Sequence, residues 1–246
     1  ERHVPGAQDH PHDDGVRPQP PVGSLLPVVD IDLLQNVELL AQLSDEEMVT
    51  VAASAQTRRY LRGDVVFVEG GEPDRLCVVS SGRVAIAKRS VDGRESMVAL
   101  MEHGGVFGEM GLFDGQGRSA EARALEASEL VEVPYEPLRR IYESRPDLLW
   151  GVVKLLAQRL RNTDSALADS VFLDVTGRTA KRLLELAGDA DDFALPITQE
   201  ELAGMVGASR ERVNKAIASF VRLRWIEQHD RRYRITNREE LERRAR

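Results

Sequence analysis

The sequence predicts an α+β protein in which a β-rich N-terminal half, one long helix and a small C-terminal winged helix-turn-helix follow one another. Short β-rich runs alternate with turn residues between positions 58 and 134. A heptad pattern follows Pro146, and two helical segments joined by Gly207 come after it. The 246 residues are enough for two modest domains, so this order of elements fits the length of the chain.

The first 24 residues differ in composition from the rest of the chain. They are rich in Pro, Asp, Gly and His and show no hydrophobic period, so we expect a flexible Pro-rich arm over 1–24. His3, His10 and His12 in this arm could bind a metal. We expect a solvated tail instead, and no metal site.

Helical and then strand signals predict a domain over 25–145. Apolar residues at near-helical spacing from Ile31 to Leu43 predict helical structure, and the capping-box pattern at Ser44–Glu47 predicts a helix through about Ala55. The β-rich runs that follow read VVFVEG, RLCVVS, RVAIAKR, SMVALM and LVEVP. Short strands at regular spacing predict an antiparallel sandwich or barrel, and Asp92-Gly93 predicts a hairpin turn.

One long helix and a hinge are expected over 146–173, with the helix ending near Val171. Its seam positions recur at alternating steps of four and three residues, and they are Leu149, Val153, Leu156, Leu160, Thr163 and Leu167. Such a heptad seam is typical of helices that pair with one another. We therefore expect a homodimer; the alternative is that the helix packs on the barrel of its own chain.

The last domain is expected over 174–246. A helix begins at Asp174 or Thr176 and ends near Gly188, and a second capping box at Thr198–Glu201 opens the next helix. Gly207 supplies a turn, and Ser209 caps a further helix, RERVNKAIASFVR. The segment from Trp225 to Ile235 predicts a hairpin, which would make this a winged helix-turn-helix.

The charge distribution indicates an anionic partner at the C-terminal end. The net charge is −8, but residues 207–246 hold twelve Lys and Arg against six Asp and Glu, which leaves twenty-one against thirty-five for the rest of the chain. An acidic body that ends in a basic domain suggests that this domain binds an anionic partner. A solvated basic helix end is the alternative.

The second helix of a helix-turn-helix enters the major groove with its first residues at base edges. Here those residues are Ser209, Arg210, Glu211, Arg212, Asn214 and Lys215. Arg and Lys can donate to guanine, and Glu can accept from cytosine, at about 1–3 kcal/mol of discrimination for each good pair. The alternative is an amphipathic helix with a charged outer face, since Val213, Ile217 and Phe220 form an apolar stripe opposite these residues.

The glycine-rich stretch GEMGLFDGQGRSA at 108–120 predicts a nucleotide site. Glycines let backbone N–H groups approach a ligand closely, and Arg118 with Ser119 can donate to a phosphate. A phosphate alone would be repelled by Glu109, whereas a carboxylate accepts well from a ribose hydroxyl. An ordinary Glu–Arg surface pair on a glycine-rich loop is the alternative.

Several other classes of protein find little support. The single Cys77 excludes a disulfide framework, and no apolar run approaches the roughly 18 residues of a membrane span. No GxxxxGK[ST] run and no convincing nucleophile–His pair is present, so we do not expect an enzyme. A cytoplasmic protein without membrane contact is the expectation.

Three motifs in this order resemble the cyclic AMP receptor protein (CRP/FNR) family of transcription regulators, over Leu34 to Arg246. GEMGLFDGQGRSA is similar to their phosphate-binding cassette, FLDVTGR at 172–178 to their hinge, and ITQEELAGMVGASRERVNKAI to their helix-turn-helix. The resemblance implies an N-terminal antiparallel β-roll (a double-stranded β-helix) that binds cyclic AMP as an allosteric ligand. The residues it implies as ligand contacts are Gly108, Glu109, Met110, Arg118, Ser119 and Ala120 in the cassette, and Thr163 and Asp164 on the dimerisation helix.

The same resemblance implies a two-fold operator with TGTGA-like half-sites and RNA polymerase as a further partner. Asp164 departs from the Ser or Asn of well-known members and adds negative charge near an anionic ligand, which Arg159 could partly offset. Lys215 replaces a common Arg and has less bidentate geometry. Constitutive DNA binding, a response to another signal, and a nucleotide-binding module or enzyme without DNA binding remain the alternatives.

Overall fold

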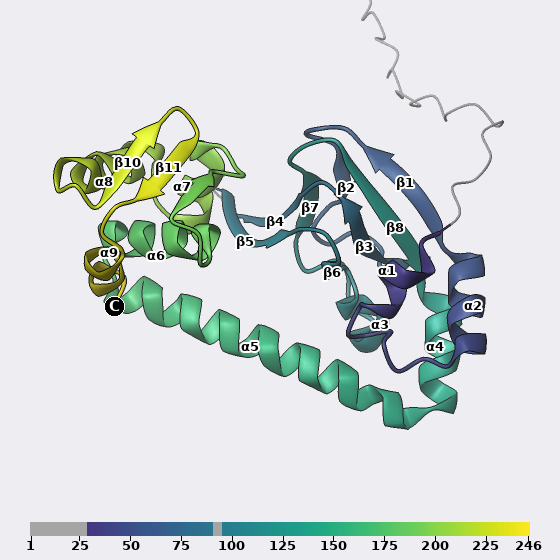
Figure 1. Ribbon diagram of the computed structural model, residues 1–246. Coiled ribbons are helices and arrows are strands. Elements are labelled where there is room, and N and C mark those ends of the chain that lie inside the picture. The colour runs from purple at the N-terminus through teal and green to yellow at the C-terminus, as the bar shows by residue number, and fades with distance from the viewer. Residues whose placement is uncertain (1–28, 91–94) are drawn as a thin grey trace, which may run out of the picture.

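The computed structural model describes residues 29–90 and 95–246. It consists of a two-sheet β-roll with helices at one end, a long helix α5 (Leu149–Phe172), and a small C-terminal domain at the far end of that helix (Figure 1). This is the α+β architecture that the sequence predicts. The Pro-rich arm with its histidines, and the expected turn at Asp92-Gly93, lie outside the described residues.

Two four-stranded antiparallel sheets form the roll, in the orders β1-β8-β3-β6 and β2-β7-β4-β5. The strands are β1 (Gln56–Tyr60), β2 (Val65–Phe67), β3 (Arg75–Ser81), β4 (Val84–Arg89), β5 (Glu95–Met101), β6 (Val106–Phe107), β7 (Glu121–Ala124) and β8 (Ser128–Pro134). Val79, Phe107 and Leu130 are among the apolar side chains buried between the sheets. The order of strands brings β6 beside β3. The loop that follows β6 therefore lies at one end of the roll.

Short helices cover that end of the roll. They are α1 (Ile31–Gln35), α2 (Asp45–Ser54), α3 (Met110–Asp114), α4 (Tyr135–Ser144) and the 3-10 turn η1 (Pro146–Leu148). The predicted capping box is present, since Ser44 and Glu47 exchange side-chain and backbone hydrogen bonds. Leu34 and Leu138 pack with Val131 of β8 in a shared core, which anchors the helices to the sheet.

Helix α5 begins at Leu149, after η1, and ends at Phe172. All six of its seam side chains are exposed in the single chain: Thr163 and the apolar Leu149 (40%), Val153 (51%), Leu156 (39%), Leu160 (61%) and Leu167 (63%). Only Gly151 and Val152 of this helix are buried. Within the part of the chain that the structure describes, the seam is therefore not covered by the roll of its own chain.

The C-terminal domain has the predicted order of elements, with one strand (β9) and one helix (α9) more than the sequence suggests. Its elements are α6 (Val175–Ala187), β9 (Asp192–Ala194), α7 (Gln199–Val206), α8 (Arg210–Arg222), β10 (Ile226–His229), β11 (Arg232–Ile235) and α9 (Arg238–Arg244). Asp174, Thr198 and Ser209 cap the helices α6, α7 and α8. Gly207 ends α7 with φ of +68°, the left-handed conformation that favours glycine.

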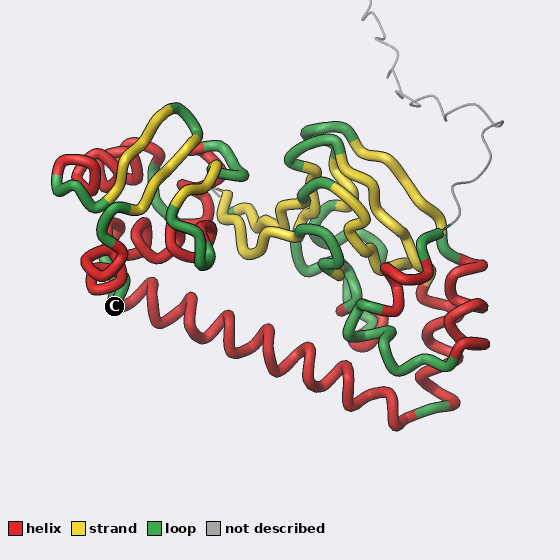
Figure 2. Tube along the Cα trace, in the orientation of Figure 1, coloured by secondary structure: helices red, strands yellow, loops and turns green. Residues whose placement is uncertain are grey.

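The roll and the C-terminal domain also touch away from α5, where α7 packs against β5 (Figures 1 and 2). Met97 of β5 and Ala85 of β4 belong to the same apolar core as Leu202 of α7. At the border of this contact Arg62 Nη2 donates to Glu201 Oε1 at 3.2 Å. Strands β4 and β5 thus provide the surface of the roll against which the C-terminal domain packs.

Candidate nucleotide site and nucleic-acid interface

The glycine-rich stretch connects β6 to β7 and contains the short helix α3. Gly108 precedes this helix with φ of +75°, and a Cβ atom there would lie 2.6 Å from Arg118 Nη1. A side chain at this position would be strained and would collide with the arginine. Gly108 therefore allows the guanidinium of Arg118 to fold back beneath the backbone.

Arg118 lies inside the roll, with a side chain that is 2% exposed. Its Nη1 donates to the Gly108 carbonyl at 2.7 Å and to the Tyr135 hydroxyl at 3.2 Å. The guanidinium carbon lies 4.2 Å from the centre of the Phe67 ring, a cation–π contact. These contacts fix one edge of the guanidinium, while its Nε atom is buried without a hydrogen-bond partner among the described residues.

Two residues that sequence reasoning missed complete this arrangement. Asp74 accepts from Arg118 Nη2 at 3.2 Å and from the neighbouring Arg75 at 2.7 Å. Tyr135 donates its hydroxyl to the Gly108 carbonyl, and burial, the largest effect, raises its pKa to about 12. Asp74 ends a loop and Tyr135 starts a helix, so nothing in their local sequence indicates that they meet a residue 44 or 17 positions away.

Glu109 is fully buried, and Arg159 of α5 donates to its Oε1 atom. Arg159 also donates to the Val106 carbonyl at 2.8 Å, so it connects the long helix to the cassette. Sequence reasoning assigned this arginine the role of offsetting Asp164; its partner in the structure is Glu109 instead. The second oxygen of Glu109, Oε2, is buried and has no partner in the described part of the chain.

The remaining expected ligand contacts lie on the cassette and on α5. The exposed Ser119 donates its hydroxyl to Met110 Sδ at 3.5 Å, and Ala120 is buried. Thr163 and Asp164 are exposed on α5, one turn beyond Arg159, and the Thr163 hydroxyl donates to the Arg159 carbonyl at 2.9 Å. The cassette thus offers one unpartnered donor (Arg118 Nε) and one unpartnered acceptor (Glu109 Oε2), which suit a phosphate and a sugar hydroxyl.

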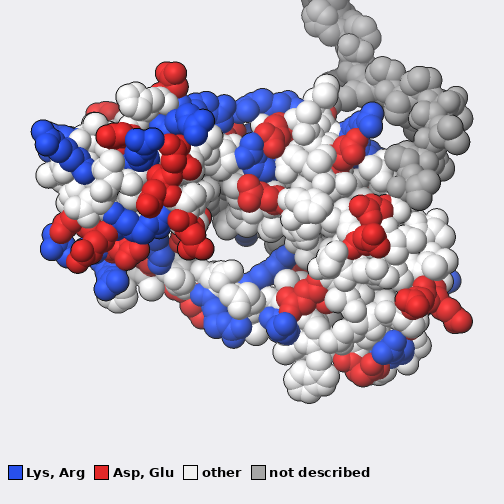
Figure 3. Space-filling model, viewed as in Figure 1, with Lys and Arg blue, Asp and Glu red and all other residues white. Residues whose placement is uncertain are grey.

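The predicted recognition helix is α8, and its first turn faces solvent. Ser209, Arg210, Glu211, Arg212 and Lys215 are exposed, and Asn214 is half-buried with an unpartnered Oδ1 atom among the described residues. The opposite stripe of Val213, Ile217 and Phe220 is buried, as the sequence predicts. Basic side chains on this domain are interspersed with acidic ones (Figure 3). Because its apolar stripe is buried and its polar residues are exposed, the polar face of α8 is accessible to the major groove of DNA.

In the hairpin beside α8, the positive charges of two arginines are partly neutralised by a neighbouring aspartate. Arg232 and Arg234 of β11 donate to Asp192 of β9 at 3.0 and 3.2 Å, and the pKa of Asp192 is lowered by these hydrogen bonds. The sequence did not reveal β9, because three residues carry too little of a strand pattern. Within residues 29–90 and 95–246, no helix could cross a membrane and no cluster of His, Cys, Asp and Glu could hold a metal ion.

A β-roll with a buried Glu–Arg cassette, followed by a long helix and a helix-turn-helix, defines a DNA-binding regulator with a nucleotide-binding domain as the class of protein. Residues 57–145 match the cyclic nucleotide-binding domain family, and residues 177–244 match the Crp-like helix-turn-helix domain family. The chain belongs to the CRP/FNR family of transcription regulators. Members of this family are regulators and not enzymes.

Relatives and solved structures of this family cover most of the chain. The CRP-like cAMP-activated global transcriptional regulator of Mycobacterium tuberculosis is 37% identical over 222 residues, 87% of this chain and 99% of the relative. The cAMP-activated global transcriptional regulator Vfr of Pseudomonas aeruginosa is 34% identical over 178 residues, 68% of this chain and 83% of the relative. The structure of the c-di-GMP responsive global regulator CLP of Xanthomonas campestris has a TM-score of 0.68 at 26% identity, covering 78% of this chain and 99% of its own. FixK2 of Bradyrhizobium japonicum shares the fold, with a TM-score of 0.70 at 21% identity over 77% and 96% of the two chains.

Proposed function

We propose that this protein is a homodimeric transcription regulator whose affinity for DNA is modulated by cyclic AMP bound in the roll. The observation that carries the proposal is the pair of unpartnered buried atoms, Arg118 Nε and Glu109 Oε2. Leaving buried polar atoms unpaired costs on the order of 1–3 kcal/mol each, so a ligand that satisfies both is favoured. Cyclic AMP offers a phosphate acceptor and a ribose donor, and related proteins are named as cAMP-activated.

In this proposal the phosphate lies on Arg118 and Ser119, and the ribose hydroxyl donates to Glu109. Gly108, Met110 and Ala120 line the sugar–phosphate wall, and Thr163 and Asp164 of α5 meet the adenine. Carboxylate oxygens only accept hydrogen bonds, so Asp164 favours the amino group of adenine over the carbonyl of guanine. Cyclic AMP, once bound, contributes the charge and hydroxyl that complete the cassette.

The dimer forms through the exposed seam of α5 in this scheme. Two recognition helices, one from each chain, then read half-sites about one DNA turn, ~34 Å, apart. Arg210 and Lys215 donate to guanine in TGTGA-like half-sites, and Glu211 accepts from cytosine. Ser209, Arg212 and Asn214 contact neighbouring phosphates and bases. The basic excess of residues 207–246 supports this assignment.

Ligand and DNA are coupled through Arg159. This arginine holds Glu109 from α5, and α5 leads to the hinge at Leu173–Asp174. A ribose hydroxyl that donates to Glu109 Oε2 adds a contact to the carboxylate that Arg159 holds through Oε1, so ligand binding changes the relative stability of the helix arrangements. A coupling of about 1–3 kcal/mol is enough for a 5- to 150-fold change in affinity for DNA.

The test is fluorescence anisotropy of a TGTGA-palindrome duplex, titrated with protein at fixed salt, with and without cyclic AMP. We expect cyclic AMP to tighten binding by tenfold or more, and Arg118→Ala to remove this response while leaving ligand-free binding. Cyclic di-GMP is a third arm, because one structural relative is named for that ligand. Specific binding that is indifferent to cyclic AMP, or an Arg118→Ala variant that still responds, would overturn the proposed ligand or its site.

The remaining parts of the proposal follow from the family. Residues 25–145 form the nucleotide-binding domain, 146–173 the dimerisation helix with its hinge, and 174–246 the DNA-binding domain, after an arm over 1–24. A cytoplasmic location and contact with RNA polymerase at the promoter fit a transcription regulator. Co-sedimentation of the DNA-bound protein with RNA polymerase tests the second of these.

A further inference from the structure

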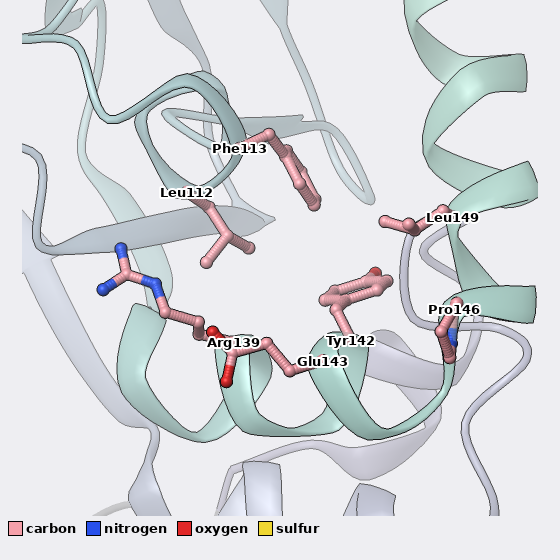
Figure 4. Close-up of a pocket in the computed structure, with 7 residues that line it drawn as sticks. All are labelled: Leu112, Phe113, Arg139, Tyr142, Glu143, Pro146 and Leu149. Carbon is pink, nitrogen blue, oxygen red and sulfur yellow. The ribbon is translucent and has the colours of Figure 1, made fainter.

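A groove of about 380 Å³ lies between α3, α4 and the start of α5, and neither Arg118 nor Glu109 lines it. Leu112, Phe113 and Tyr142 supply most of its apolar lining, with the rings of Phe113 and Tyr142 in edge contact at 5.4 Å, and the charged Arg139 and Glu143 also line it. Figure 4 shows these side chains converging on the cavity, with Leu149 pointing into it from α5. A groove of this size and composition suits one large apolar side chain.

The groove is continuous with the heptad seam of α5. Leu149, the first seam residue, lines it, and Pro146, three residues earlier, lies at its rim. The same spacing of three and four residues continues through Val153 and Leu156, both of which are exposed. In a parallel pair of helices each layer of the seam meets the same layer of its partner. The start of a partner helix would therefore lie over this groove.

Trp150 is the side chain best placed to fill it. It follows Leu149 directly and is 75% exposed, a high fraction for the largest apolar side chain. In heptad terms Leu149 occupies position d and Trp150 position e, which flanks the seam and faces the partner helix. Burying an aromatic ring removes about 150–250 Å² from water. The exposed Trp150 side chain of one copy is thus complementary, in size and in apolar character, to the preformed groove of another copy.

We propose that Trp150 of a second copy of this chain packs into the groove formed by α3, α4 and Leu149, and that each subunit does so reciprocally. This inference rests on the homodimer of the proposed function. It goes beyond that dimer because the inserted ring contacts Leu112 and Phe113, which belong to the cassette helix α3. The partner subunit thereby supports the helix that follows Glu109, and dimer contact and ligand site share one element.

Acrylamide quenching of tryptophan fluorescence tests this placement. The chain has two tryptophans, so a Trp225→Phe variant leaves Trp150 as the sole reporter and replaces one aromatic ring by another beside Phe220. Sedimentation velocity on the same samples reports the fraction of dimer. We expect the quenching constant to fall severalfold, with a blue-shifted emission, as the protein passes from monomer to dimer. A dimer in which Trp150 remains fully accessible overturns this inference alone, while absence of a dimer overturns the proposed homodimer as well.

A truncation series provides the second measurement. Trp150→Ala is expected to raise the dimer dissociation constant by 10- to 100-fold. Leu61→Ala is the matched control, because Leu61 is a 70% exposed apolar side chain in the roll, outside the seam, and its truncation should leave the constant within twofold. Equal dissociation constants for Trp150→Ala and the parent protein would contradict the insertion, even if the dimer itself forms.

Discussion

Arg159 of the long helix and Glu109 of the nucleotide-binding cassette form an ion pair in which the carboxylate is fully buried. The two residues are 50 positions apart, and their pairing is the direct link between α5 and the site. A buried carboxylate must be paired to remain ionised at low cost. The same arginine therefore serves the stability of the roll and the proposed response to ligand.

Replacing Arg159 by Ala should destabilise the protein. The change leaves the Glu109 carboxylate unpaired in a buried site, at a cost on the order of 2–3 kcal/mol. For a chain of this size that corresponds to a fall of about 5–10 °C in the melting temperature, measured by calorimetry. The control is Arg161→Ala, which removes an exposed arginine of the same helix and should shift the melting temperature by about 1 °C or less. An Arg159→Ala melting temperature equal to that of the control would refute the importance of the pair.

Gly108→Ala should weaken nucleotide binding more than a glycine-to-alanine change at a comparable position does. Both the positive φ and the collision with Arg118 Nη1 oppose a methyl group at this position. Gly104 is the matched control: its φ is +77°, but no atom lies within 4 Å of the position of a Cβ. Each variant loses about 1 kcal/mol to backbone strain, and only Gly108→Ala should also weaken nucleotide binding, by tenfold or more in calorimetric titration. Equal nucleotide affinities in the two variants would show that nucleotide binding does not require the close approach of Arg118 to Gly108.

Arg210→Ala should weaken binding to the specific operator by about 1–3 kcal/mol, or roughly 5- to 150-fold, because the residue begins the recognition helix. Discrimination should relax at one base pair of each half-site. Arg243→Ala is the control, an exposed arginine of α9 that pairs with Glu240. Competition anisotropy with operators substituted one base pair at a time provides the measurement. A uniform loss across all operators would instead assign Arg210 to the phosphate backbone.

Asp174 should make stability depend on pH in the acid range. Its pKa is lowered, first by the hydrogen bond from the Gly177 backbone N–H and then by Arg244. A depressed pKa means that the charge stabilises the fold above the ordinary Asp value near 3.8, and this contribution is lost as the pH falls through the lower folded value. Asn caps helices nearly as well as Asp, so Asp174→Asn should cost only about 0.5 kcal/mol at pH 7. Urea unfolding should show this difference shrinking below about pH 4; a constant difference would contradict it.

Much of the fold could be predicted because its signals are local. Caps at Ser44, Thr198 and Ser209 depend on hydrogen bonds that span three residues, and all three are present. The seam of α5 and the apolar stripe of α8 are likewise patterns within single helices. In contrast, the helical spacing from Ile31 to Leu43 predicts a first helix that is longer than the one in the structure, which ends at Gln35. Asn36 caps it there, with its side-chain amide donating to the Asp32 carbonyl.

The parts that could not be predicted depend on contacts distant in sequence. β1, with the sequence QTRRY, has a polar composition because it lies at the edge of its sheet and is mostly exposed. The cassette residues Glu109 and Arg118 were found from their motif, whereas their partners Arg159 and Asp74 come from other elements. Only the three-dimensional arrangement brings those charges together. The motif therefore predicts the candidate residues Glu109 and Arg118, but it does not indicate the residues that hold them in place.

In the proposed function, the contact between α7 and β5 sets a free-energy cost that a ligand must offset before the C-terminal domain can move. Met97 of β5 is buried in the core of the C-terminal domain, so any movement of that domain away from the roll exposes apolar surface to water. A ligand shifts such an equilibrium only by the difference between its affinities for the two arrangements. In the proposed function, a ligand whose affinities for the two arrangements differ too little leaves the recognition helix in place. Met97, which belongs to neither the proposed nucleotide contacts nor the proposed DNA contacts, thereby contributes to the threshold for the response.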